Sequence, residues 1–171
     1  MRGEALKQNV VAGYGFCCVG DGSKIIYKRS RRKNSLADDV AALMLSQSDE
    51  KTELRDFSPF DGDERQYCSP GFDLPYGCFL NSAPKEFIEY HTSADDKSII
   101  DFEAMSRLIQ LMLDCCETIE NNRSFKRTDP YCEPKLDQFG LWSTLGVGSS
   151  GEYPKLNYAL NWLLNLSLIH I

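Results

Sequence analysis

An almost continuous apolar run, NVVAGYGFCCV at residues 9–19, constrains the fold of this chain more than any other feature. Such a run is typical of a strand buried on both faces, in a sheet that helices cover. Further strands are predicted at residues 25–27, 51–57 and 74–80. A chain of 171 residues is long enough to enclose one core of this kind. We therefore expect an α/β fold built on a mixed sheet.

Two helices are expected to pack on that sheet. Ser35 and Asp38 have capping-box spacing, which predicts a helix beginning there. Its buried side would comprise Leu36, Val40, Leu43 and Met44. Residues 101–120 are the clearest helix, because apolar residues recur at three- and four-residue steps. The predicted stripe comprises Phe102, Met105, Ile109, Met112, Cys116 and Ile119. We interpret it as core packing and not as a cofactor site.

The character of the chain changes after residue 120. Residues 121–151 are rich in polar residues and glycine and include Pro130 and Pro134, which is typical of an extended connector or a lid. Residues 153–166 return to a helical pattern. The apolar tail at residues 167–171 lacks a polar helix cap, so we expect a truncated or artificial end there.

Charge and hydropathy exclude some classes of function. A formal net charge of -6 argues against general nucleic-acid binding. The basic run KRSRRK at residues 28–33 is either a solvated loop or an anion contact near a substrate site. No apolar stretch reaches the roughly 18 residues of a membrane span, and the first residues lack the apolar core of a signal peptide.

The cysteines indicate a reducing compartment. There are seven, including the adjacent pairs Cys17–Cys18 and Cys115–Cys116 in apolar surroundings. No C-x-x-C pattern occurs, which argues against a zinc ribbon or a thioredoxin-type site. Buried, reduced thiols in a cytoplasmic protein are the simplest interpretation.

Three local motifs carry candidate chemistry. They are Gly20-Asp21, the segment GDERQYCSPGFDLP at residues 62–75, and EYHTSAD at residues 89–95. His91 has the side chain of a common zinc ligand, and Asp95 could orient the His91 ring or Thr92. Asp95 could instead cap a helix or a turn, and Asp21 is either a metal ligand or a turn residue.

The last motif resembles the His-Thr-x-x-Asp motif of the co-catalytic zinc aminopeptidases, and the segment 62–75 resembles their Ser-Asp-His…Gly-Ile-Pro segment. Here Gly62-Asp63-Glu64 replaces Ser-Asp-His. The chain is more similar to a bacterial aminopeptidase-like subfamily whose members often accompany polysaccharide-biosynthesis genes. That similarity covers roughly residues 8–164, nearly the whole chain.

The resemblance implies a three-layer, zinc-exopeptidase-like mixed sheet with flanking helices. It implies the C-terminal half of a catalytic domain at residues 1–120 and a connector and helix at 121–166 that lead to a winged-helix module. It also implies zinc as cofactor, with His91 and Asp21 as ligands. A His ligand, a bridging Asp and a general-base Glu would lie in an upstream half, so this chain could not build the site alone.

Glu64, Arg65 and Gln66 are candidate substrate-binding residues. Arg65 could bind a substrate carboxylate with its planar guanidinium, or form an ion pair with Asp63 or Glu64. The first hypothesis for function is a zinc-dependent aminopeptidase-like hydrolase acting on a peptide or another amide. The second is a non-catalytic sugar- or peptide-binding protein on the same fold. A cytoplasmic regulatory module is the third, and the lack of a strongly basic recognition helix argues against it.

Overall fold

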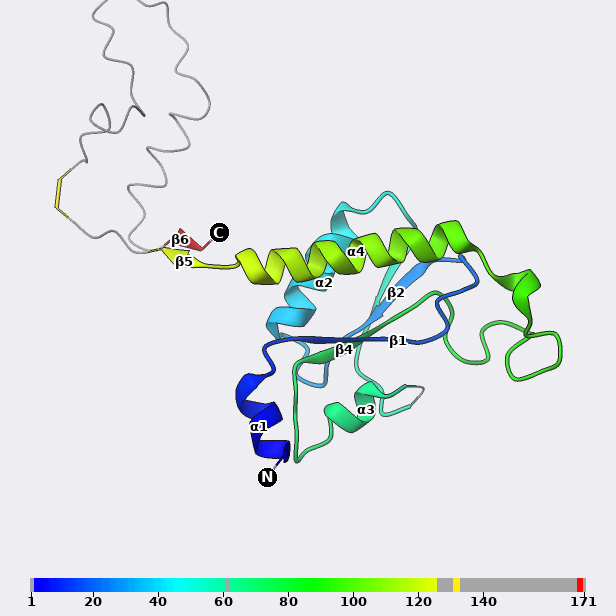
Figure 1. Cartoon of the computed structure of the whole chain (residues 1–171), viewed down its shortest axis with the longest axis horizontal. Helices are drawn as coiled ribbons and strands as arrows, with labels where there is room; N and C mark the ends of the chain where they lie inside the picture. The colour runs from blue at the N-terminus through cyan, green and yellow to red at the C-terminus, as the bar shows by residue number, and fades with distance from the viewer. Residues whose placement is uncertain (1, 61, 126–130, 133–168, 171) are drawn as a thin grey trace, which may run out of the picture. The chain divides into compact units, whose positions relative to one another are not determined.

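The computed structural model of this protein describes residues 2–60, 62–125, 131–132 and 169–170 (Figure 1). The chain divides into two compact units, Met1–Glu120 and Asn121–Ile171. The helices are α1 (Arg2–Asn9), α2 (Leu36–Gln47), α3 (Glu64–Tyr67), the 3-10 helix η1 (Lys97–Ile99) and α4 (Phe102–Asn121). The strands are β1 (Gly13–Phe16), β2 (Ile25–Lys28), β3 (Thr52–Arg55), β4 (Tyr76–Leu80), β5 (Ser124–Phe125) and β6 (Ile169–His170).

The first unit contains a four-stranded mixed sheet with the order β1-β4-β2-β3. Strand β4 is parallel to β1 and antiparallel to β2, and β2 is parallel to β3. Every residue of the central strand β2 is buried, as are four of the five residues of β4. The mixed α/β fold expected from the sequence is thereby confirmed.

The prediction of a doubly buried strand over residues 9–19 was wrong in length and position. Asn9 ends a helix, and β1 is a short strand at the edge of the described sheet. Phe16 is 43% exposed. A Cβ atom added at Gly13 would lie 2.3 Å from Cδ2 of Tyr76. The Tyr76 ring of β4 therefore packs directly over the backbone of Gly13 in β1, where only glycine leaves room. Apolar character alone does not distinguish an edge strand from a central one, because pairing decides that position.

One face of the sheet is covered by α2 and α4. Ile25, Tyr27 and Phe79 point from the strands into a core that both helices complete. The helical members of this core are Val40, Ala41, Leu45, Leu108, Leu111 and Cys115. Ile26, Cys78 and Leu80 form a smaller cluster with Cys17 on the other face. In Figure 1, α3 and α4 lie on opposite sides of the sheet, which gives the three layers expected.

The capping box at the start of α2 is present, with Ser35 accepting from the backbone of Asp38 and the Asp38 side chain accepting in return. The predicted buried sides of the helices need correction, however. Leu43 is 46% exposed, and Phe102 and Ile109 of α4 are 70% and 51% exposed. The residues of α4 that are buried are Ala104, Leu108, Leu111 and Cys115. The apolar residues of α4 form one broad face, and the buried residues occupy only one side of it, so periodicity alone does not select the stripe that packs on the sheet.

In the second unit, β5 and β6 form an antiparallel pair, with Ser124 opposite His170 and Phe125 opposite Ile169. The predicted helix at residues 153–166 and most of the predicted connector lie outside the described residues. None of the helices in the described part of the chain has the length and apolar character needed to span a bilayer.

Candidate functional site

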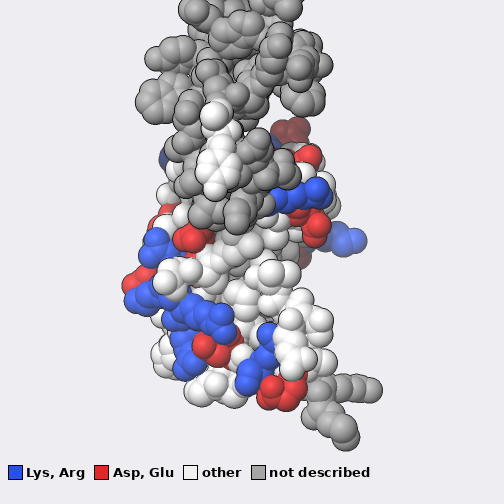
Figure 2. Space-filling view, turned by 90° about the vertical axis from the view of Figure 1, so that its left-hand side faces the viewer, with Lys and Arg blue, Asp and Glu red and all other residues white. Residues whose placement is uncertain are grey.

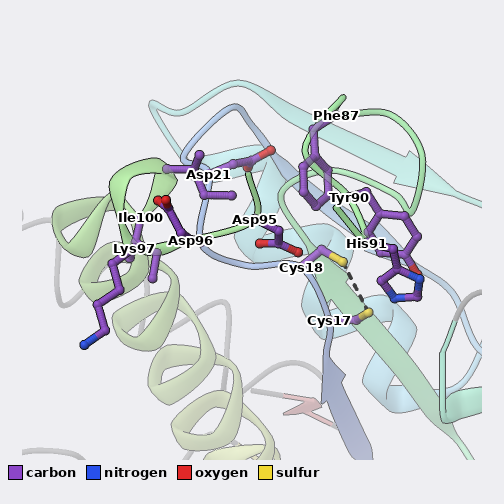
Figure 3. A pocket seen from close by; sticks show the side chains of 12 residues that line it. Cys17, Cys18, Asp21, Phe87, Tyr90, His91, Asp95, Asp96, Lys97 and Ile100 are labelled. Atoms are coloured by element: carbon purple, nitrogen blue, oxygen red, sulfur yellow. Dashed lines mark hydrogen bonds between the residues drawn. The ribbon is translucent and has the colours of Figure 1, made fainter. Parts of the chain in front are cut away.

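A cavity of about 570 Å³ lies beside the carboxyl ends of β1 and β4 (Figure 3). The two strands are parallel, so the segments that follow them leave the sheet at the same edge. In open α/β sheets this edge is where ligands commonly bind, and the volume is in the range of small-molecule sites. The lining residues are Cys17, Cys18, Gly20, Asp21, Phe87, Tyr90, His91, Asp95, Asp96, Lys97, Ile99 and Ile100.

Backbone hydrogen bonds hold the segment after β1 against β4. The Cys17 amide donates to the Phe79 carbonyl over 3.1 Å, and the Asn81 amide donates to the Cys18 carbonyl over 3.0 Å. Cys18 has a φ of 50°, a left-handed conformation that non-glycine residues seldom adopt. The chain therefore turns sharply at Cys18 and continues along the cavity to Asp21.

Asp21 is held by two serines. Ser82 Oγ donates to one carboxylate oxygen, and the Ser23 amide and hydroxyl donate to the other over 3.3 and 3.2 Å. The bonds to Ser23 form a local turn, as one of the two interpretations of Asp21 predicts. The bond to Ser82 joins residues 61 positions apart and fixes the carboxylate at the cavity.

His91 lies in an aromatic wall of the same cavity. Its ring stacks on Tyr90, with 4.0 Å between ring centroids and 13° between planes. Tyr90 in turn meets Phe87 edge-on at 5.5 Å. His91 is exposed and has a φ of 58°, which His tolerates better than most residues. The His91 side chain is thus exposed to solvent, while stacking on Tyr90 orients the plane of its ring.

The Asp95 carboxylate points toward Cys18 in Figure 3. No hydrogen bond joins it to His91 within the described part of the chain, and the Thr92 hydroxyl donates to the Glu89 carbonyl over 2.7 Å. Burial raises the pKa of Cys18 to about 12, with further contributions from its neighbour Cys17 and from the charges of Asp21 and Asp95. The acids beside the cavity thus favour a protonated Cys18 thiol.

The three predicted substrate-binding residues lie on α3 and do not line this cavity. Arg65 and Gln66 are exposed, whereas Glu64 is 1% exposed and forms a buried ion pair with Lys28. Lys28 Nζ also donates to the Phe60 carbonyl over 2.6 Å. The structure thus brings Asp21, His91 and Asp95 together and places Glu64, Arg65 and Gln66 apart from them.

The basic run at residues 28–33 is largely neutralised by nearby acids. Arg31 and Arg32 both bind Asp73, over 2.9 and 3.2 Å, and Lys33 binds Asp56 over 2.8 Å. Figure 2 shows basic and acidic side chains interleaved on one face of the molecule. This arrangement favours the interpretation as a solvated loop over that of an anion site.

Sequence reasoning missed the part that Cys17, Cys18, Phe87 and Tyr90 play in the cavity. The sequence pattern predicts buried, reduced thiols at Cys17 and Cys18, but their position near the end of the predicted strand also indicates the edge of the sheet. Tyr90 belongs to the motif at residues 89–95 but receives no role there, and Phe87 lies outside the motifs. The turn that brings their rings together is defined only by the folded chain.

Residues 1–122 match the family described as "Domain of unknown function (DUF4910)". The match covers more than half of the chain, and this protein therefore belongs to that family.

A relative in Clostridium acetobutylicum is described as "Putative polysaccharide biosynthesis protein with aminopeptidase-like domain". It is 34% identical over 166 residues, which cover 97% of this chain and 38% of the relative. The crystal structure of a protein described as a "putative peptidase" from the same organism matches with a TM-score of 0.72 and 29% identity, over 99% of this chain and 44% of that one. The chain thus spans less than half the length of both, and its relatives are aminopeptidase-like or peptidase-like by description.

Proposed function

We propose that this chain forms part of an aminopeptidase-like hydrolase domain that cleaves a peptide or another amide, with zinc as cofactor. The main support is the cavity that brings Asp21, His91 and Asp95 to one edge of the sheet. The descriptions of the relatives as aminopeptidase-like or peptidase proteins support the same reaction class.

The donor chemistry of the cavity fits zinc in part. An exposed imidazole and a carboxylate are both zinc ligands, and His91 and Asp21 would supply them. Among the residues that the structure describes, no three His, Cys, Asp or Glu side chains form a group able to hold a metal ion. We therefore propose that further ligands come from other parts of the full-length protein. When bound, zinc would act as a Lewis acid on the scissile carbonyl.

The residues of this chain would orient the metal and the substrate. Stacking on Tyr90 fixes the plane of the His91 ring, and Ser82 and Ser23 orient the Asp21 carboxylate. Asp95 would act from the rim of the cavity through its charge. Arg65 and Gln66 are exposed on α3 and would contact the part of a longer substrate that extends beyond the cavity.

The test is the zinc content and aminopeptidase activity of the full-length protein and of its His91→Ala variant. We expect the variant to lose bound zinc and activity. His170→Ala, which removes the chain's other histidine, is the matched control and should keep both. Unchanged zinc content and activity in His91→Ala would disprove the proposal.

The alternative is a non-catalytic sugar- or peptide-binding protein on the same fold. The ion pair between Glu64 and Lys28 favours it, because this motif residue is used structurally where the zinc aminopeptidases have their Ser-Asp-His segment. Binding of peptides or sugars by a full-length protein that holds no zinc and cleaves no amide would establish this alternative. A cytoplasmic location is part of both proposals.

A further inference from the structure

We propose that Cys17 and Cys18 form a reversible, peroxide-sensitive dithiol in the wall of the cavity, which closes to a disulfide between the adjacent residues. The two Sγ atoms lie 3.6 Å apart (Figure 3). Both sulfurs belong to residues that line the cavity, so an oxidant of the size of hydrogen peroxide can reach them from there.

The backbone places the two sulfurs close together. Adjacent residues of an extended strand point to opposite faces, which would keep the thiols apart. The left-handed φ of 50° at Cys18 breaks this alternation directly after β1. Hydrogen bonds from Cys17 to Phe79 and from Asn81 to Cys18 fix the turn on both sides. The short distance between the sulfurs therefore follows from an anchored backbone conformation.

Cys115 and Cys116, the other pair of adjacent cysteines, show how a helical backbone places two neighbouring thiols. In α4, Cys115 is completely buried in the core. Cys116 is exposed, and its sulfur lies 3.9 Å from that of Met112. Successive residues of a helix point about 100° apart, so this pair is splayed. Burial raises the pKa of Cys115, like that of Cys18, to about 12, so geometry is what distinguishes the pairs.

The chemistry balances with hydrogen peroxide as the oxidant. The Cys17 sulfur attacks one peroxide oxygen, the O–O bond breaks, and Cys17 becomes a sulfenic acid while one water leaves. The Cys18 sulfur then attacks the Cys17 sulfur, the S–O bond breaks, and a second water leaves with the Cys18 proton. Two thiols are oxidised by two electrons, and one peroxide is reduced to two waters.

The closed form would be labile and would reshape the cavity wall. Adjacent Cα atoms are about 3.8 Å apart, below the roughly 4.4–6.8 Å usual for disulfides. A strained disulfide is easily reduced by thiols, so the change is reversible. Closure draws the sulfurs from 3.6 Å to about 2 Å beside His91 and Asp95.

Peptide mapping tests the proposal on the whole protein, because trypsin releases the two pairs separately. Residues 8–24 contain only Cys17 and Cys18, and residues 108–123 contain only Cys115 and Cys116. After brief treatment of the folded protein with hydrogen peroxide, free thiols are alkylated with N-ethylmaleimide before digestion. The protein is unfolded in the alkylating agent, so that buried thiols also react, and is then digested. We expect peptide 8–24 to carry no alkyl group and to have lost two hydrogen atoms. Peptide 108–123 should be alkylated twice. Dithiothreitol should restore double alkylation of peptide 8–24.

Two further measurements guard against misfolding and non-specific oxidation. Cys18→Ser should stop internal closure, whereas Cys116→Ser, the matched control, should leave it unchanged. Phenylarsine oxide, which bridges two nearby thiols with loss of water, should protect Cys17 and Cys18 of the folded wild-type protein from alkylation. Equal oxidation of both peptides, sulfinic acid as the main product, or a disulfide between molecules would overturn the proposal. The proposal would also be overturned if phenylarsine oxide bound Cys17 and Cys18 but peroxide formed no disulfide between them.

Discussion

The two faces of the sheet each bury a carboxylate, and they satisfy it in different ways. On the face covered by α2, Asp38 of that helix is 1% exposed and accepts hydrogen bonds from Ser30, Ser35 and Tyr27. On the opposite face, Glu64 of α3 is equally buried, and its partner is the ammonium group of Lys28. Apart from this ion pair, its oxygens accept no hydrogen bond from the described residues.

The difference has energetic consequences. A carboxylate that accepts several short hydrogen bonds recovers much of the solvation that it loses on burial. Burial alone would raise the pKa of Asp38, but hydrogen bonds from Ser30 and Ser35 outweigh it and hold the pKa below its usual value. Glu64, in contrast, depends on the single ammonium group of Lys28 to offset the solvation that its carboxylate loses on burial. The helix-covered face therefore distributes its polar interactions, and the opposite face concentrates them in one pair.

The largest effect is expected from Lys28→Met. It would leave the buried Glu64 carboxyl group without its partner, which costs roughly 3–5 kcal/mol of the free energy of unfolding. Urea unfolding monitored by circular dichroism measures the change. The double variant Lys28→Met/Glu64→Leu is the control and should recover wild-type stability or exceed it. A single variant as stable as the wild type would show that Glu64 does not depend on Lys28.

Asp38→Asn should have the next largest effect, a loss of roughly 2–3 kcal/mol. The amide keeps one acceptor oxygen, but its NH2 group faces a backbone N–H donor at either position, that of Ser30 at Oδ1 or that of Ser35 at Oδ2. The same urea experiment measures it, with Asp39→Asn as the matched neighbour on α2. Asp39 is exposed, so its variant should remain close to the wild type.

The pH dependence of stability should sharpen the comparison further. The pKa of Asp38 is lower in the folded state than in the unfolded chain, where it is about 3.9. The contribution of the Asp38 charge to the free energy of unfolding is therefore complete above a pH of about 4. It is lost as the pH falls through the folded-state pKa. Other acids titrate in this range, so the measured quantity is the difference in unfolding free energy between wild type and Asp38→Asn. That difference should shrink on acidification; a constant difference would contradict the role of the Asp38 charge.

The smallest effect is expected from Arg32→Ala. Arg32 binds Asp73 over 3.2 Å with its side chain 49% exposed, so water screens the pair. The loss should be below about 1 kcal/mol and should diminish further in high salt. A loss as large as that of Lys28→Met would mean that burial does not set the strength of charge pairs in this protein.

Local sequence rules predicted several elements of the fold. The capping box of Ser35 and Asp38 correctly gave the start of α2, and the apolar residues at 25–27 gave the central strand β2. These signals depend on neighbours within one turn or one strand. The prediction of burial is wrong at Phe102 and Ile109, because the apolar face of α4 is broader than its contact with the sheet and only docking selects the part that is buried.

The candidate site was predicted in part. His91, Asp21 and Asp95 were identified from their residue types and motifs, and they do line one cavity. Glu64 was assigned to substrate from its motif, yet in the fold it is paired with Lys28, 36 positions earlier in the chain. A motif identifies which residues are special, but long-range packing determines what each one contacts.

By itself, the sequence determined the helices α2 and α4, the strand β2, the mixed α/β class and the resemblance to aminopeptidase-like proteins. It did so because hydrophobic periodicity, caps and motifs are local properties of the chain. Only the tertiary structure decided that β1 lies at an edge, that Glu64 is buried with Lys28, and that Cys17 and Cys18 meet beside His91. Those outcomes depend on strand pairing and on contacts between distant segments, which no local pattern records.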